Sequence, residues 1–242
     1  MSKHKEFILT PVSTILKDVI LANSGIGAGI ETFPLSEYVF QSIFLKMTGF
    51  QEQKMKCISW EMATNDFDYR RNLLGNDDKL GECSTYESKN KIFKRLFSLI
   101  GKNEPSFQMS EVLDYNAIRN YSTDEVKLKF KDTNLSIWNE KSYSFFCQNA
   151  KEIIKPNHFA KSDKNLFESS LQEFYKNLYA HRNRCAHNTL SYQENLPTLS
   201  TLFDSEYPNN NYFIWFSLLI LIDRIFIDLY TKYTKTLEEA IW

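Results

Sequence analysis

The stretch Phe167-Glu-Ser-Ser-Leu-Gln-Glu-Phe-Tyr-Lys-Asn-Leu-Tyr-Ala-His-Arg-Asn-Arg-Cys-Ala-His187 has the clearest helical periodicity in this chain. Its apolar positions recur at spacings of four, three and four residues: Phe167, Leu171, Phe174 and Leu178. Such spacings place side chains on one face of an α-helix, so we predict a helix over residues 165–187. Arg182 continues the same stripe by four residues. We therefore expect the helix to run from an apolar core into a polar end, with Arg182 at the point where the core stops.

Most of the remaining chain shows the same kind of pattern. Its 242 residues are 43% hydrophobic and 15% aromatic, but they include only 7 glycines and 6 prolines. This scarcity of turn formers argues against an all-β fold, which needs many tight turns. Apolar spacing predicts further helices over residues 11–22, 37–47, 51–74, 89–100, 143–154 and 211–238. We expect Gly49 to separate two of them, and an all-α helical bundle that forms a single domain over residues 1–242.

One segment departs from the helical pattern. In Glu125–Asp132, apolar residues alternate with lysines: Val126, Leu128 and Phe130 against Lys127, Lys129 and Lys131. A period of two predicts a strand, and residues 135–138 offer it a partner, so we expect a small β-hairpin near residues 125–138. The lysines suit a solvated sheet edge, where charge discourages pairing with another chain. They also suit contact with a phosphate backbone.

Composition and charge exclude several classes of protein. The net charge of −1 gives no overall attraction to nucleic acid, so contact with RNA would need a local basic patch. The four cysteines form no CxxC pair, and we expect neither a metal site nor a cofactor. The apolar run 212–222 is shorter than the ~20 residues of a membrane span, which indicates a buried core helix. With reduced cysteines and no signal peptide, we expect a cytoplasmic protein without a membrane partner.

The end of the 165–187 helix holds three candidate catalytic residues, Arg182, Asn183 and His187. When RNA is cleaved by its own 2′-hydroxyl, protons must be moved and the phosphorane must be stabilised. Histidine exchanges protons near neutral pH. Arginine keeps its charge and donates paired hydrogen bonds to phosphate oxygens. The amide of Asn183 can orient the histidine or a substrate hydroxyl, so the three residues together suit RNA cleavage without a metal.

A second interpretation of this helix end needs no activity. Cations near the C-terminus of a helix stabilise it by about 0.3–1 kcal/mol each, because they complement its dipole. This explains the charge, but it does not explain why Arg182 lies on an apolar stripe. A cation there is costly unless it is paired or lines an interface. We therefore favour a functional role for Arg182 and His187.

An arginine, an adjacent polar residue and a histidine after four intervening residues resemble the motif of the HEPN superfamily (higher eukaryotes and prokaryotes nucleotide-binding). Here these residues are Arg182, Asn183 and His187, at the end of a helix in a helical chain. The segment from Ser36 to Arg71 also looks like the front part of plasmid- and defence-associated bacterial members. The resemblance covers a core of about 30–240 and implies a HEPN-like helical bundle.

The resemblance implies a metal-independent RNA endonuclease of a bacterial toxin–antitoxin or antiphage defence system. Two protomers would pair as a homodimer and bring two copies of Arg182 and His187 to one cleft, because a single histidine serves poorly as both acid and base. The product would carry a 2′,3′-cyclic phosphate. Expected partners are RNA, a second copy of the chain, and an antitoxin or another defence component. The alternative is a non-catalytic HEPN module that binds RNA, a nucleotide or a protein partner.

This chain departs from the family pattern at one position. Some HEPN toxins are silenced by a nucleotidyltransferase that modifies a tyrosine two residues after the motif histidine. Here that position is Thr189, and the nearest tyrosine is Tyr192. The departure argues against this mode of silencing.

Further charged and polar residues have weaker assignments. We expect flanking contacts with RNA from five residues: His181, Arg184, Lys176, Arg70 and Arg71. Cys185 is expected to pack in the core rather than act as a nucleophile. Four acids of the predicted 51–74 helix could partner Arg182, bind a metal or remain solvated: Glu52, Glu61, Asp66 and Asp68.

Overall fold

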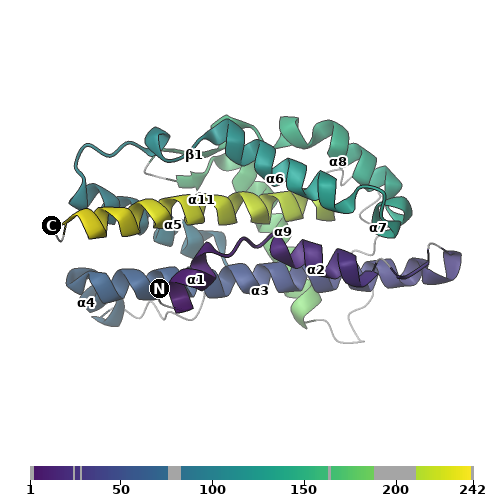
Figure 1. The fold of residues 1–242 in the computed structure, drawn as a ribbon, viewed down its shortest axis with the longest axis horizontal. Helices are drawn as coiled ribbons and strands as arrows, with labels where there is room; N and C mark the ends of the chain where they lie inside the picture. The colour runs from purple at the N-terminus through teal and green to yellow at the C-terminus, as the bar shows by residue number, and fades with distance from the viewer. Residues whose placement is uncertain are drawn as a thin grey trace.

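Two long helices form the centre of the structure, a computed structural model that describes residues 3–23, 25–27, 29–75, 83–162, 165–187 and 211–240. Helix α3 spans Phe33–Asn65 and helix α11 spans Tyr212–Ala240. They pack against each other along the long axis of the molecule (Figure 1). Every residue from Tyr212 to Asp223 is buried, which confirms that this apolar run is a core helix. None of the helices in the described residues is long and apolar enough to span a membrane.

The remaining helices surround this central pair. Their bounds are α1 Lys3–Leu9, α2 Thr14–Asn23, α4 Phe67–Gly75, α5 Tyr86–Asn103, α6 Tyr115–Phe130, α7 Asn134–Trp138, α8 Glu140–Ile153 and α9 Ser169–His187. Short 3₁₀ turns lie at Ile30–Thr32, Met109–Glu111 and Pro156–His158. The all-α prediction is therefore confirmed.

The predicted break at Gly49 is wrong, because α3 continues through it. A glycine inside a helix costs only about 1 kcal/mol, and packing against α11, α1 and α9 outweighs that cost. The break comes instead at Asp66, which is extended. Its carboxylate accepts the backbone N–H of Tyr69 at 2.6 Å and so fixes the first turn of α4.

A β-hairpin exists, but not at the predicted place. Strand β1, Phe159–Ser162, pairs antiparallel with strand β2, Asn165–Phe167. Phe159 lies opposite Phe167, and both side chains are buried. The hairpin leads directly into α9, which is why α9 begins at Ser169 and not at residue 165.

The predicted strand within 125–138 is wrong, because these residues belong to α6 and α7. Val126 and Phe130 are four residues apart and both fully buried, whereas Leu128 is 69% exposed. The apolar residues therefore do not share a face, as they would in a strand. The Lys127 Nζ atom donates to the backbone oxygen of Cys147 at 2.9 Å, which ties α6 to α8. Tertiary contacts override the local alternation here.

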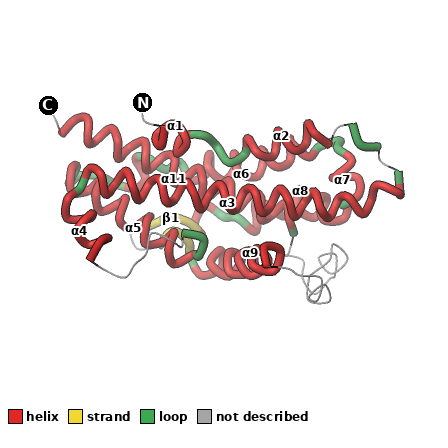
Figure 2. The backbone as a smooth tube through the Cα atoms, turned by 90° about the horizontal axis from the view of Figure 1, so that it is seen from below, coloured by secondary structure: helices red, strands yellow, loops and turns green. Residues whose placement is uncertain are grey.

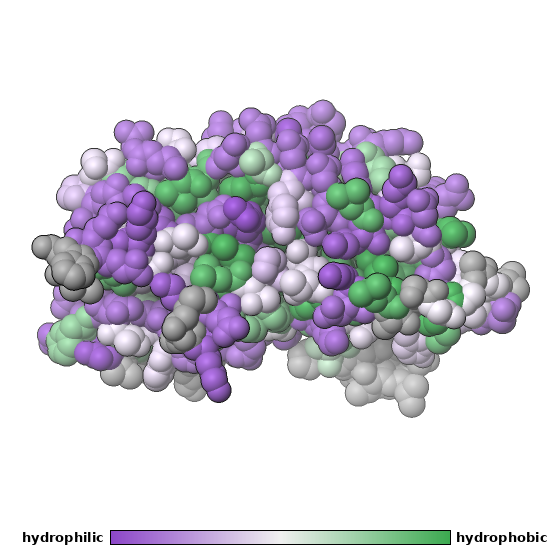
Figure 3. Space-filling view, in the orientation of Figure 1, coloured by the Kyte–Doolittle hydropathy of each residue, from purple (hydrophilic) through white to green (hydrophobic). Residues whose placement is uncertain are grey.

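The core beside α11 is rich in aromatic rings. Phe40 of α3 stacks on Phe130 of α6 and Phe216 of α11, with centroid distances of 5.8 and 6.1 Å. Phe213 meets Phe40 edge-on at 5.3 Å. On the face seen in Figure 3, apolar side chains form separate patches between hydrophilic ones. The aromatic core holds α3 and α11 together, and these two helices support α9.

Candidate functional site

Helix α9 is anchored by its apolar face. Leu171, Tyr175 and Leu178 are each at most 2% exposed, and α9 contacts α3, α5 and α11. The helix crosses α3, and its C-terminal end extends beyond it (Figure 1). Of the predicted stripe, Leu171 and Leu178 are buried on α9, Phe174 is partly buried, and Phe167 lies in β2 before the helix begins. The buried face of α9 also includes Tyr175 and His181, and Arg182 is partly buried beside it.

Arg182 is paired, as the cost of placing a cation on an apolar stripe requires. Its Nη2 atom lies 3.4 Å from Oε2 of Glu52 on α3, and its Nη1 atom donates to Oδ1 of Asn183 at 3.2 Å. Glu52 also holds Lys56 through Oε1 at 2.8 Å. The side chains of Arg182 and Glu52 are only 24% and 15% exposed. Of the four acids considered as partners, Glu52 is the one that the structure pairs with Arg182.

Asn183 and His187 follow Arg182 on the last turns of α9. The backbone of α9 is helical through His187, whose side chain lies outside the described structure. Because position 187 lies four residues after position 183, the two positions are one helical turn apart. The contact between Arg182 and Asn183 brings a guanidinium group to the same turn. Thr189 and Tyr192 lie outside the described residues.

The charges of Arg182 and Glu52 also act on a buried lysine, Lys89, which the sequence pattern did not reveal. Lys89 of α5 is 2% exposed, and its Nζ atom donates to the backbone oxygens of Cys83 and Ser84 at 2.9 and 3.0 Å. The same atom lies 5.4 Å from the ring centroid of Tyr175 on α9. Burial lowers the pKa of Lys89 to about 7, nearby Glu52 opposes that shift, and the charge of Arg182 adds to it. The carboxylate of Glu52 thus pairs with Arg182 and Lys56, and its charge also acts on Lys89.

His181 is not available for the RNA contact that we expected of it. Its side chain is fully buried, and Nε2 lies 2.8 Å from the hydroxyl of Tyr212 on α11. The imidazole packs against Trp215 with centroids 4.6 Å apart. Burial, aided by the charge of Arg184, lowers the pKa of His181 to about 3, so the ring is neutral near pH 7. The stripe that carries His181 faces the core, and its role there is packing.

The other expected RNA contacts are spread over the molecule. Arg184 lies on the exposed face of α9, and Lys176 is exposed and pairs with Glu173 at 3.5 Å. Arg70 and Arg71 are exposed on α4, which lies well away from the end of α9 (Figure 2). The structure therefore does not bring Arg70 or Arg71 together with Arg182.

The contacts of Asp66 and Cys185 indicate that both residues serve the fold. Asp66 binds Lys102 at 2.8 Å in addition to capping α4, and the described residues include no group of three His, Cys, Asp or Glu side chains placed to hold a metal. The thiol of Cys185 is half-buried, with Sγ 3.3 Å from Nε2 of His181. Burial raises the pKa of Cys185 to about 11, which disfavours the nucleophilic thiolate.

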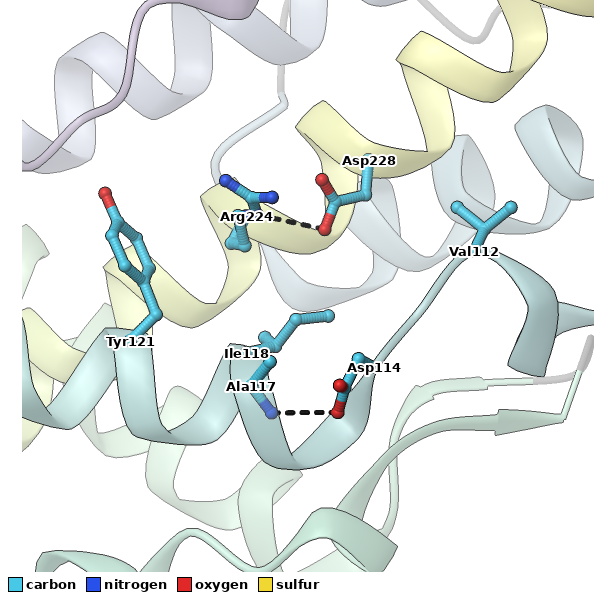
Figure 4. A pocket seen from close by; sticks show the side chains of 7 residues that line it. All are labelled: Val112, Asp114, Ala117, Ile118, Tyr121, Arg224 and Asp228. Atoms are coloured by element: carbon cyan, nitrogen blue, oxygen red, sulfur yellow. Dashed lines mark hydrogen bonds and ion pairs between the residues drawn. The ribbon is translucent and has the colours of Figure 1, made fainter.

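A separate pocket of about 340 Å³ opens between α6 and α11 (Figure 4). Its charged groups are already engaged. Arg224 binds Asp228 at 3.0 Å, and Asp114 accepts the backbone N–H of Ala117 at 2.9 Å as the N-cap of α6. None of the motif residues lines the pocket, so the end of α9 is the stronger candidate site.

Comparisons of this chain with protein-family models, with curated proteins and with solved structures find no match. The candidate function therefore rests on the motif and on its surroundings in the fold.

Proposed function

We propose that this protein is a metal-independent RNA endonuclease of the HEPN type, acting in a bacterial toxin–antitoxin or antiphage defence system. The observation that carries the proposal is the way Arg182 is held. A cation that only complemented the helix dipole would be solvated, but Arg182 is mostly shielded and is oriented by Glu52 and Asn183. Such fixed geometry suits an arginine that must meet a phosphate in one orientation.

Each motif residue has a role in this proposal. Arg182 binds the scissile phosphate and stabilises the charge that builds up on its oxygens. His187 moves the proton of the 2′-hydroxyl or of the leaving 5′-oxygen. Asn183 positions these groups by hydrogen bonding. Glu52 is a positioning residue, because its carboxylate anchors Arg182 to α3.

A second copy of the chain completes the proposed site. One protomer supplies a single His187, whereas the reaction needs a proton acceptor and a proton donor on opposite sides of the phosphate. A symmetric homodimer would supply both through the same surface. The end of α9 extends beyond α3 (Figure 1), and the surface shared with the second protomer lies there in this proposal.

The test is cleavage of total RNA by the purified protein, with and without a chelator. We expect His187→Ala and Arg182→Ala each to lower the cleavage rate by a factor on the order of 100 or more, because each removes a group that acts in the transition state. The chelator should leave the parent rate unchanged. His4→Ala and Arg224→Ala are matched controls outside the site, and both should cut at the parent rate.

Cleavage by His187→Ala at the parent rate would contradict the proposal. A dimer that binds RNA through Arg182 but leaves it intact would instead support the non-catalytic binding module.

A further inference from the structure

Glu52 of α3 holds two cations at once, and solvent reaches both. Its Oε2 atom lies 3.4 Å from Nη2 of Arg182, and its Oε1 atom lies 2.8 Å from Nζ of Lys56. The side chains of Arg182 and Lys56 are 24% and 28% exposed. One carboxylate cannot neutralise two cations, so the three side chains together keep an excess of positive charge. Because both cations contact the same carboxylate, an anion bound at Arg182 lies close to Lys56 as well.

Trp60 extends this group by one more helical turn. Glu52, Lys56 and Trp60 follow one another at intervals of four residues in α3, so they occupy one stripe of the helix. Each step of four residues advances about 6 Å along the helix axis. The core-facing residues Ile58 and Met62 are fully buried, whereas Trp60 is 55% exposed. Tryptophan is mostly buried in folded proteins, so an indole half in solvent is an unusual feature of this surface.

The stripe leads away from Arg182 along the molecule. Helix α3 meets α9 at Glu52 and runs on from there toward α4 (Figure 2). A cation, Lys56, and then an aromatic ring, Trp60, therefore follow Arg182 in order. Proteins bind single-stranded nucleic acid with such combinations, because cations pair with phosphates and aromatic rings stack on bases. The bases of a duplex are already stacked on one another, so an exposed indole favours an unpaired strand.

We propose that Lys56 and Trp60 form an RNA track, a surface that binds single-stranded RNA on one side of the scissile phosphate held by Arg182. Lys56 binds the phosphate next to the scissile one, and Trp60 stacks on an unpaired base further along the strand. The advance of about 6 Å per turn suits the repeat of an extended strand. The inference rests on the proposed function, since it takes Arg182 as the phosphate ligand. It deepens that function by naming unpaired RNA as the substrate class.

The first measurement is the salt dependence of RNA binding. A short single-stranded 2′-O-methyl RNA cannot be cut, because it lacks the attacking hydroxyl, and fluorescence anisotropy gives its affinity at several salt concentrations. Lys56→Gln should bind more weakly and lower the magnitude of the slope of log affinity against log salt by about 0.7, the contribution of one phosphate contact to a single strand. Lys56→Arg should restore both. Lys232→Gln is the matched control, because Lys232 pairs with Glu104 at 2.6 Å and is 20% exposed, and it should bind like the parent.

The second measurement is stacking on Trp60. Loss of an aromatic ring that stacks on a base lowers affinity by about 5- to 150-fold, and Trp60→Ala should fall in this range. Trp60→Phe keeps a ring and should retain most of the affinity. Stacking quenches indole emission, so RNA should quench part of the tryptophan fluorescence of the parent but not that of Trp60→Phe. Leu128→Ala is the control, because it removes an apolar side chain of α6 that is 69% exposed, and its affinity should be unchanged.

A duplex of the same sequence tests the substrate class. Its bases cannot reach Trp60, so the parent should bind the duplex more weakly than the single strand. Trp60→Ala should lose most of this preference. Equal binding of the two forms by the parent would overturn the assignment of Trp60 to an unpaired base.

Two further results would reject the RNA track. The first is a parent-like salt slope in Lys56→Gln or a parent-like affinity in Trp60→Ala. The second is a loss of self-association in Trp60→Ala, seen by analytical ultracentrifugation, while its affinity for RNA stays unchanged. The indole would then belong to a protein interface.

The RNA track and the nuclease fail separately, because the 2′-O-methyl RNA is not a substrate. Binding that depends on Lys56 and Trp60, in a protein that leaves total RNA intact, would uphold the RNA track and reject the nuclease. Cleavage that His187→Ala abolishes, in a protein whose RNA binding ignores Lys56 and Trp60, would do the reverse.

Discussion

Lys54 and Lys89 are buried to the same depth but are compensated in opposite ways. Lys54 is fully buried, and its Nζ atom lies 2.5 Å from Oδ1 of Asp223 on α11 and 2.6 Å from the backbone oxygen of Thr10. The other oxygen of Asp223 accepts the backbone N–H of Val12 at 2.8 Å. Lys89 has carbonyl groups and an aromatic ring in the corresponding places.

The partners of the two lysines determine what role each buried charge can have. Lys54 and Asp223 compensate each other, so the pair joins α3, α11 and the segment before α2 as a permanent cross-link. Lys89 donates its hydrogen bonds to backbone carbonyl groups instead, so its charge depends on more distant neighbours. The first site is suited to holding the fold, whereas the charge of the second changes with pH near neutrality.

The largest expected effect comes from breaking the compensated site. Asp223→Asn would leave Lys54 charged and without its counter-ion in the core, and we expect unfolding to become easier by about 3–5 kcal/mol. Urea denaturation measures the change. Arg224→Ala is the control, because it removes a neighbouring but partly exposed ion pair worth less than about 1 kcal/mol. Equal losses in the two variants would show that the Lys54 site is no more important than a surface pair.

A smaller effect should appear at Lys89 and depend on pH. Because the pKa of Lys89 is lower in the folded protein than in the unfolded chain, the unfolded chain binds more protons between pH 7 and 10. Stability therefore rises with pH across this window. We expect the unfolding free energy of the parent, relative to that of Lys89→Met, to rise by roughly 3 kcal/mol from pH 7 to pH 9.5. Urea denaturation at several pH values measures it, and a difference that stays constant would contradict the assignment.

The smallest effect on stability should come from Glu52→Gln. The three side chains involved are partly exposed, so the loss should stay below about 1 kcal/mol. The pKa of Lys89 should nevertheless fall further, because Glu52 supports its charged form. Glu104→Gln, which breaks a similar pair with Lys232 at 2.6 Å, is the matched control and should leave Lys89 unchanged. Nitrogen-detected NMR separates the two results.

The sequence predicted the place of Arg182 because its helix has one simple stripe. The same rule finds Lys89, which lies on the buried stripe Tyr86, Lys89, Phe93, Leu96 and Ile100 of α5. The predicted helix begins at residue 89 and therefore leaves out Tyr86, so Lys89 does not stand out as part of a buried stripe. The boundary of α5 depends on the N-cap at Thr85, whose hydroxyl accepts the N–H of Ser88.

Other features could not be read from local patterns. The partner of Arg182 is 130 residues away in the chain, and four acids on the predicted helix were equally eligible. His181 and Arg182 are adjacent on one helix, yet only the packing of α9 against its neighbours shows that the imidazole is fully buried and the guanidinium only partly. The alternation in 125–132 predicts a strand, but most of these residues belong to α6. The helices that α6 packs against decide this, and a local pattern does not reveal them.

The contact between His181 and Trp215 has an optical consequence. Trp215 is 1% exposed and packs on the imidazole that α9 inserts into the core, whereas Trp60 is 55% exposed. Indole emission shifts to longer wavelength in water, so the two residues should contribute at opposite ends of the emission band. Replacing Trp60, Trp138 and Trp242 by Phe would leave Trp215 as the single tryptophan, with a blue-shifted signal from the interior. That signal would follow the seating of α9 on α11 in real time, without any label on the site itself.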